Sequence, residues 1–257
     1  MDLGITGRTA VVCASTSGLG EAVARALAAE GAHVVISGRR GERARQIAGE
    51  LPSAVEVEAD VTDPTGDERL LAAAREAFGE VDILILNGPG PKSGPAAHVS
   101  EPDVDAAIDT LLRPQVRLVS AVLPGMRERR WGRILAVGST GVSAPLPHLA
   151  LSNLGRAALA GYLKTLAAEV AADGVTVNLL LPGRIATDRA AALDEGRAER
   201  SGRSIDDVRE ESRAEIPARR YGDPAEFGSV GAFLCSEQAS YVTGTAVRCD
   251  GGLVRSL

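Results

Sequence analysis

Short runs of apolar and β-branched residues alternate along this chain with Ala- and Leu-rich stretches of helical period. Two runs, Ile83–Leu86 and Asn178–Leu181, are almost continuously apolar, as expected of strands that are buried on both faces of a sheet. The alternation therefore predicts a parallel, doubly wound α/β sheet with helices on both faces. We expect seven strands, at Thr9–Ala14, His33–Ser37, Ala54–Glu58, Asp82–Asn87, Arg133–Ser139, Thr176–Leu181 and Thr245–Cys249.

The 257 residues contain no internal repeat, low-complexity tract or linker, which predicts a single domain over residues 1–257. One stretch, at about 188–216, interrupts the alternation of strands and helices. It is helical by propensity, dense in charge and placed between two expected core strands. We expect a helical insertion there, which is either a solvated pair of surface helices or a mobile cover over a pocket.

Composition excludes several classes of partner. The net charge of −6 argues against electrostatic binding to nucleic acid or to an anionic membrane, and 3% aromatic residues argue against a stacking platform for bases. No apolar run approaches the ~18 residues that span a bilayer. The first residues show no basic region followed by an apolar stretch, so we do not expect secretion. The scattered Cys13, Cys235 and Cys249 are expected to be reduced thiols rather than metal ligands. We therefore expect a cytoplasmic protein without a metal, whose partner is a small molecule.

The first expected strand runs directly into a glycine-bearing turn and a helix. Such a junction binds phosphate because backbone N–H groups and the positive end of the helix dipole point at the anion. After the first strand of an α/β pattern it indicates a dinucleotide site, although a tight turn without a ligand stays an alternative. The expected cofactor contacts in this turn are Ser15, Ser17, Gly18, Leu19 and Gly20.

The residues after the second expected strand bear on the choice of cofactor. An acidic residue there would bind the ribose hydroxyls and repel a 2′-phosphate, whereas an arginine accommodates that phosphate. The chain has Arg39 and Arg40, which predicts NADP(H) over NAD(H), with Arg39 the principal contact. The alternative is that both are solvated arginines at a helix start. Asp60 and Val61, just beyond the third strand, are expected to flank the adenine.

These blocks and several later ones resemble the short-chain dehydrogenase/reductase family, and within it the 3-oxoacyl-acyl-carrier-protein reductases. The resemblance covers nearly the whole chain and includes Asn87–Gly90, Gly138-Ser139, Pro182–Thr187, Tyr241–Gly244 and Asp250–Gly252. It implies a Rossmann fold and an oxidoreductase that acts on a carbonyl or alcohol. It also implies a homotetramer, or a homodimer, packed through helices at about Pro114–Arg129 and Leu151–Ala172. The further cofactor contacts that it implies are Asn87, Gly88, Pro182, Gly183, Ile185 and Thr187.

The chain departs from the family pattern at the glycine turn and at the catalytic residues. The turn begins Cys13-Ala14 where the family has Thr-Gly, and the added methyl is expected to weaken cofactor binding. The family places a Ser on the fifth strand and Tyr-x-x-x-Lys on the next helix. With Ser139 as the strand serine, Ser152 stands at the Tyr position and Arg156 at the Lys position. The family's Asn maps to Thr110 or Leu111.

These replacements affect proton transfer. A serine hydroxyl is a far weaker acid than a phenol beside a lysine, and an arginine does not relay protons. His148, four residues before Ser152, is a candidate substitute because an imidazole titrates near neutral pH, although a plain surface histidine is the alternative. Lys92 and His98 are weaker candidates. Ser139 either polarises a carbonyl or caps backbone groups.

The prediction is therefore an NADP(H)-binding oxidoreductase, similar to 3-oxoacyl reductases, with a non-standard site made of Ser139, Ser152, Arg156 and His148. One alternative is a non-redox enzyme, such as a dehydratase, isomerase or cyclase, in which these groups stabilise an oxyanion. Another is a catalytically inactive homologue that binds the cofactor. The segments that select the substrate, around 91–97 and 188–216, carry no diagnostic pattern, so the sequence leaves the substrate open.

Overall fold

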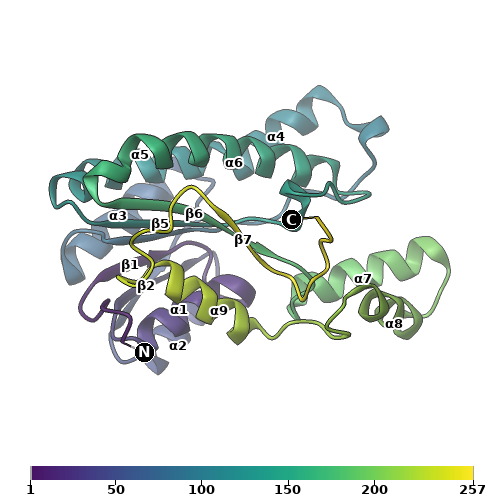
Figure 1. The fold of residues 1–257 in the computed structure, drawn as a ribbon, viewed down its shortest axis with the longest axis horizontal. Helices are drawn as coiled ribbons and strands as arrows, with labels where there is room; N and C mark the ends of the chain where they lie inside the picture. The colour runs from purple at the N-terminus through teal and green to yellow at the C-terminus, as the bar shows by residue number, and fades with distance from the viewer. Residues whose placement is uncertain (1, 257) are drawn as a thin grey trace.

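The computed structural model describes residues 2–256, and all seven predicted strands are present in it. They pair in parallel in the order β3-β2-β1-β4-β5-β6-β7, which confirms the predicted doubly wound α/β fold (Figure 1). β1 ends two residues earlier than predicted because the chain turns at Ala14, where φ is +47°. The strands are β1 (Thr9–Val12), β2 (His33–Gly38), β3 (Ala54–Glu58), β4 (Ile83–Leu86), β5 (Gly132–Val137), β6 (Val175–Pro182) and β7 (Ala246–Cys249).

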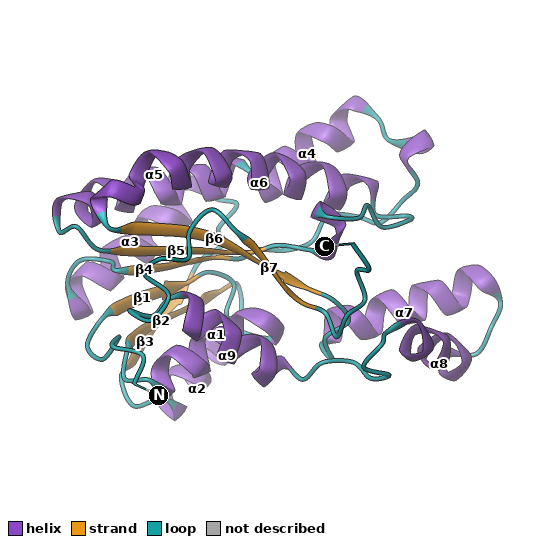
Figure 2. Ribbon diagram, in the orientation of Figure 1, coloured by secondary structure: helices purple, strands orange, loops and turns teal. Residues whose placement is uncertain are grey.

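Helices cover both faces of the sheet (Figure 2). They are α1 (Gly18–Ala29), α2 (Gly41–Glu50), α3 (Pro64–Phe78), α4 (Glu101–Leu111), α5 (Arg113–Glu128), α6 (Ala150–Val170), α7 (Asp188–Ser201), α8 (Ile205–Glu215) and α9 (Pro224–Leu234). α1, α2 and α9 cover one face, where Leu27 and Phe227 are fully buried. α3, α5 and α6 cover the other, where Leu70, Leu118 and Leu163 are fully buried. Alternate residues of the strands enter these two cores, which explains their continuous apolar runs.

The direction of the chain changes at β1, which pairs with β2 on one side and with β4 on the other. In a doubly wound sheet, this change leaves a crevice at the carboxyl ends of the strands, because the following helices go to opposite faces. The glycine turn after β1 and the segment after β4 open onto that crevice. The fold thus places the site where the sequence predicts a dinucleotide.

The charged insertion folds as the helix pair α7 and α8, which extends away from the sheet (Figure 1). α7 is attached to the body by Asp194, which is fully buried and accepts from Arg184 Nη1 at 2.8 Å and from Tyr221 Oη at 2.9 Å. Its Leu193 and Arg197 line the cavity described below. The insertion therefore forms part of the wall of the pocket, through α7 and through Glu215 at the end of α8.

Over residues 2–256, no helix has the length and apolarity needed to cross a membrane. The same residues show no cluster of side chains suited to a metal ion. Cys13, Cys235 and Cys249 are all free thiols. Burial raises the pKa of Cys13 and of Cys235 to about 12, so these two thiols stay protonated at neutral pH.

Candidate functional site

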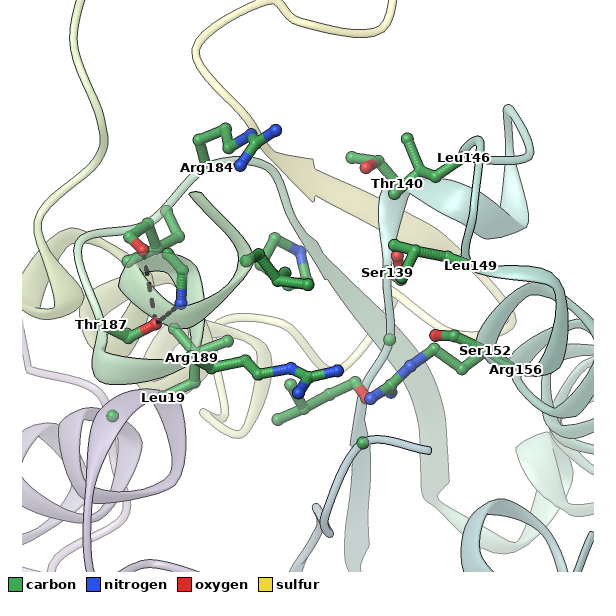
Figure 3. Close-up of a pocket in the computed structure, with 18 of the residues that line it drawn as sticks. Leu19, Ser139, Thr140, Leu146, Leu149, Ser152, Arg156, Arg184, Thr187 and Arg189 are labelled. Atoms are coloured by element: carbon green, nitrogen blue, oxygen red, sulfur yellow. Dashed lines mark hydrogen bonds between the residues drawn. The ribbon is translucent and has the colours of Figure 1, made fainter. Parts of the chain in front are cut away.

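A cavity of about 1690 Å³ lies at the carboxyl ends of the strands, with the sheet on one side and α7 on the other (Figure 3). Most of the predicted site residues line it. Those predicted to bind the cofactor and found in its wall are Ser17, Gly18, Leu19, Arg39, Arg40, Asp60, Val61, Asn87, Gly88, Pro182, Gly183, Ile185 and Thr187. Ser139, His148, Ser152 and Arg156 line it as well. The fold thus gathers segments that are far apart in the sequence.

Two predicted contacts require correction, because Ser15 and Gly20 lie behind the turn rather than in the cavity wall. The Ser15 hydroxyl donates to the Val12 carbonyl at 2.8 Å, and its N–H donates to the Ser37 carbonyl at 2.7 Å, so both of its donors are used between β1 and β2. A Cβ added at Gly20 would lie 2.6 Å from the Ala14 carbonyl oxygen. Both residues hold the turn in shape instead of facing a ligand.

The turn itself is suited to a phosphate. Gly18 has a φ of +56°, and Ser17, the N-cap of α1, makes no side-chain hydrogen bond to the helix. The first N–H groups of a helix have no partner within it, so they are left for a ligand in the cavity. Ala14 lines the cavity in a left-handed conformation that glycine adopts more easily. Asn87 Nδ2 holds the turn by donating to the Ala14 carbonyl at 3.2 Å.

The two arginines after β2 both line the cavity and differ in their contacts. Arg40 Nη2 donates to the Thr16 carbonyl at 2.8 Å, so its guanidinium is partly engaged by the turn. Arg39 is exposed and makes no ion pair or side-chain hydrogen bond within residues 2–256. The Asp60 carboxylate accepts from the N–H and the hydroxyl of Thr62, at 2.9 and 2.8 Å. Arg39 is therefore the freer cation for an anionic group at this end.

Ser139 and Ser152 lie beside each other at the opposite end, after β5 and at the start of α6 (Figure 3). Ser139 Oγ accepts from the Gly141 N–H at 3.1 Å, so the hydroxyl caps the turn and keeps its own proton available. Its two alternative roles are therefore compatible. In the described part of the chain, Ser152 Oγ has no hydrogen-bond partner. The two hydroxyls thus face the cavity as potential donors to one oxygen atom.

Arg156 is partly buried beside these serines, and its Nη1 donates to the Val137 carbonyl at 2.6 Å. Burial, with a smaller contribution from the charge of Arg189, lowers the pKa of Arg156 to about 10, so the group is still a cation at neutral pH. The family's Asn position holds no amide. Leu111 packs against Gly155 of α6, and Thr110 Oγ1 donates within its own helix to the Ala106 carbonyl at 2.7 Å.

Of the three candidate substitutes for the tyrosine, only His148 lines the cavity. It is exposed, has a φ of +59°, and its carbonyl accepts from the Gly94 N–H at 2.7 Å, which fixes the loop that carries it. Lys92 is paired with Asp103, and this pairing lowers the pKa of the Asp103 carboxyl to about 2. His98 stands in a short 3₁₀ turn (Ala96–His98) outside the cavity wall.

Arg189 is a site residue that the sequence did not single out. It stands in the first turn of α7 and its guanidinium reaches across the cavity, where Nη2 donates to the Pro91 carbonyl at 3.4 Å. A Cβ added at Gly90 would lie 3.1 Å from the same nitrogen. In the sequence Arg189 is one of many charged residues in the insertion, and only the tertiary fold separates it from the solvated ones.

Comparison with known proteins gives consistent results. The family model described as enoyl-(acyl carrier protein) reductase matches residues 13–254. The cattle (Bos taurus) dehydrogenase/reductase SDR family member 4 is 38% identical over 256 residues, which cover 97% of this chain and 88% of the relative. The 3-oxoacyl-(acyl-carrier-protein) reductase FabG of Salmonella typhimurium is 35% identical over 250 residues, 96% of this chain and 97% of the relative.

Two solved structures are similar over almost their entire length. L-sorbose reductase from Gluconobacter frateurii, in a complex with NADPH and L-sorbose, has a TM-score of 0.93 and 32% identity, with 100% of each chain covered. An actinorhodin polyketide ketoreductase variant with NADPH has a TM-score of 0.90 and 31% identity, with 96% of this chain and 97% of that chain covered.

Proposed function

The chain belongs to the short-chain dehydrogenase/reductase family, and on that basis we propose that it is an NADP(H)-dependent reductase of a carbonyl compound with a non-standard active site. The observation that carries the proposal is the single cavity that joins the uncapped start of α1, the free Arg39, and the serine pair Ser139 and Ser152. The NADPH in the similar sorbose reductase and polyketide ketoreductase supports the choice of cofactor.

The residues present fit such a cofactor. The N–H groups at the start of α1, with Thr187 opposite them, would hold the diphosphate, and Arg39 with Arg40 would hold a 2′-phosphate. Gly183 allows close packing below the cavity, because a Cβ there would lie 2.6 Å from Asp250 Cα. When bound, the nicotinamide supplies the hydride. NADP(H) is preferred over NAD(H) because the position after β2 holds Arg39 rather than a carboxylate, which would repel the 2′-phosphate.

The chain's own groups act on the carbonyl oxygen. The hydroxyls of Ser139 and Ser152 donate hydrogen bonds to it, and the Arg156 cation stabilises the negative charge that develops there. We assign the proton donor to His148, the one imidazole in the cavity wall within residues 2–256. A 3-oxoacyl thioester is the first substrate to test, because 3-oxoacyl reductases are among the similar proteins.

The test combines calorimetry with turnover. We expect NADPH to bind more tightly than NADH, and NADPH to be consumed with a member of a panel of 3-oxoacyl thioesters and quinones. NADPH binding without turnover in either direction would reject the redox proposal. Tighter binding of NADH would reject the role of Arg39 and Arg40, and an unchanged rate in His148→Ala would reject the assigned proton donor.

A second candidate function follows from the residues at the family's catalytic positions. By resemblance to the family, only Ser139 keeps a catalytic position, since Ser152, Arg156 and either Thr110 or Leu111 stand at the others. A non-redox enzyme in which the serines and Arg156 stabilise an enolate, or a homologue that only binds the cofactor, would tolerate these changes. Bound NADPH that is never oxidised would favour this candidate.

For the assembly, we propose a homotetramer or homodimer that packs through α5 and α6. Leu154 on α6 is one of the few large apolar side chains exposed in the described chain, and the exposed Ala157, Ala158 and Gly161 follow it on the same helix. Small residues allow helices to approach closely.

We also place the protein in the cytoplasm, since its free thiols suit a reducing compartment.

A further inference from the structure

The cavity is rich in positive charge. Eight arginines line it, against three carboxylates, Asp60, Asp188 and Glu215. The arginines are Arg39, Arg40, Arg156, Arg184, Arg189, Arg197, Arg200 and Arg255. Arg184 and Arg197 are paired with carboxylates, at 2.8 Å from Asp194 and 3.1 Å from Glu211. The excess of cations indicates that anionic groups occupy the cavity.

Arg156 and Arg189 form a pair of cations inside it. They come from α6 and α7, on opposite walls, and extend toward one another beside Ser152 (Figure 3). Each donates to a backbone carbonyl, of Val137 and of Pro91. Among residues 2–256, neither has a carboxylate within 4.0 Å. Burial, and to a smaller extent the charge of Arg189, lowers the pKa of Arg156, and no acidic side chain compensates it.

The phosphates of the proposed cofactor do not account for the charge of this pair. Its 2′-phosphate belongs at Arg39 after β2, and its diphosphate belongs at the turn after β1. Arg156 lies beside Val137 of β5, and the strand order places β1 and β4 between β2 and β5. Three strand spacings separate β2 from β5, which is roughly 14 Å. Arg156 and Arg189 are thus left for a different anion.

We infer that Arg156 and Arg189 bind a carboxylate on the substrate, so that the substrate is an oxo acid whose carbonyl lies at Ser139 and Ser152. This inference rests on the proposed function of the same cavity. A guanidinium has five N–H donors in a planar fork that matches a carboxylate, and each of these arginines uses few of its donors within the chain. A carboxylate between them neutralises the repulsion, and its link to the carbonyl positions the reacting carbon.

The experiment compares an acid with its ester. Acetoacetate and methyl acetoacetate are titrated by calorimetry into the protein loaded with NADP⁺, which cannot reduce them, and malonate serves as a second carboxylate probe. We expect acetoacetate to bind at least about tenfold more tightly than its ester, because charge-assisted hydrogen bonds are the strong ones. Arg189→Gln should remove this preference and change the NADP⁺ affinity by less than about twofold.

Arg209→Gln is the matched control. Arg209 lies on α8 of the same helix pair, outside the cavity wall, so its loss removes the same charge and should leave the preference intact. Equal binding of acid and ester, or no detectable binding of acetoacetate and malonate, would overturn the inference. A loss of NADP⁺ affinity in Arg189→Gln by the same factor as the loss of acetoacetate affinity would overturn it too, because Arg189 would then be a cofactor contact.

These results are separable from a failure of the proposed function. A protein that never oxidises NADPH but still prefers the acid retains the carboxylate site and loses only the redox step. If NADP⁺ does not bind, the same titrations on the cofactor-free protein decide the matter, since both arginines belong to the chain itself.

Discussion

Under the proposed function, Ser152 and Arg156 limit proton donation at the site. A serine hydroxyl holds its proton far more tightly than a phenol, whose pKa is about 10. The cavity beside Ser152 is large enough, at about 1690 Å³, to take a phenol ring. We predict that the double variant Ser152→Tyr, Arg156→Lys increases kcat for a 3-oxoacyl thioester with NADPH about 100-fold or more, since general acid catalysis contributes roughly 10² to 10⁴.

The control for this gain is Ser152→Phe together with Arg156→Lys. It adds the same bulk and the same ammonium without an acidic proton, so we expect no increase in kcat. Equal acceleration by the Phe and Tyr variants would show that the shape of the pocket, rather than proton donation, limits the present site.

Ala14 carries backbone strain in the turn that we assign to phosphate binding. Its φ of +47° lies in the left-handed region, which costs an L-residue roughly 1–2 kcal/mol and glycine little. Ala14→Gly should therefore raise the free energy of unfolding by about 1 kcal/mol, as measured by urea denaturation. Ala10→Gly, within β1, is the comparison and should lower it. A similar loss in both variants would contradict the assigned strain.

For single residues, the sequence predicted positions well where neighbouring residues in the chain form the site together. The strand, turn and helix around residues 9–29 brought Ser17, Gly18 and Leu19 to the cavity wall. The prediction failed for Ser15, because the sequence does not indicate whether its hydroxyl faces the cavity or the neighbouring strands. It also missed Arg189, since its partner Arg156 is distant in the chain and meets it only through the packing of α7.

Among the helices, α1 and α9 pack closely through the glycines of α9. A Cβ added at Gly228 would lie 2.4 Å from the Ala22 carbonyl oxygen, so a side chain there must separate the two helices. Gly228→Ala should lower the free energy of unfolding by about 2 kcal/mol, which is typical of overpacking. The measurement is urea denaturation. An m-value equal to that of the parent protein checks that unfolding is still two-state.

Gly49→Ala is the matched substitution in a helix. Gly49 stands in α2 with nothing within 4 Å of an added Cβ, so the variant should gain about 0.5 kcal/mol from helix propensity alone. If both variants changed stability equally, close packing of α1 on α9 would not be the cause.

The elements themselves were largely predictable, because short apolar runs such as Ile83–Leu86, set between helical stretches, are typical of strands that are buried on both faces. The ends of the elements were less predictable. β1 stops at Val12 because the left-handed conformation of Ala14 cannot continue a strand. The insertion was predicted to be helical from its composition. That α7 forms a wall of the cavity depends on the burial of Asp194 against Arg184 and Tyr221, a contact no periodicity encodes.

For the whole molecule, strand order determines how the cavity can be divided. β2 and β5 are three positions apart in the sheet, so Arg39 and Arg156 stand at opposite ends of one crevice. A cofactor that carries a phosphate at one end can then meet an anionic substrate at the other, with the serine pair beside the latter. Alternation of strands and helices predicts the parallel sheet, but it does not determine which strands are neighbours; the fold supplies that order.

The exposed face of α6 allows the proposed oligomer to be tested. Leu154 is 38% exposed, and a Cβ added at Gly161 would meet nothing within 4 Å, so this face is open for a partner copy. We expect the protein to sediment as a tetramer or dimer, and Leu154→Arg with Gly161→Arg to shift it to the monomer, because two charges would be buried in an apolar contact. Gly49→Arg, on the exposed surface of α2, should leave the sedimentation unchanged. A monomeric parent chain would contradict packing through this helix.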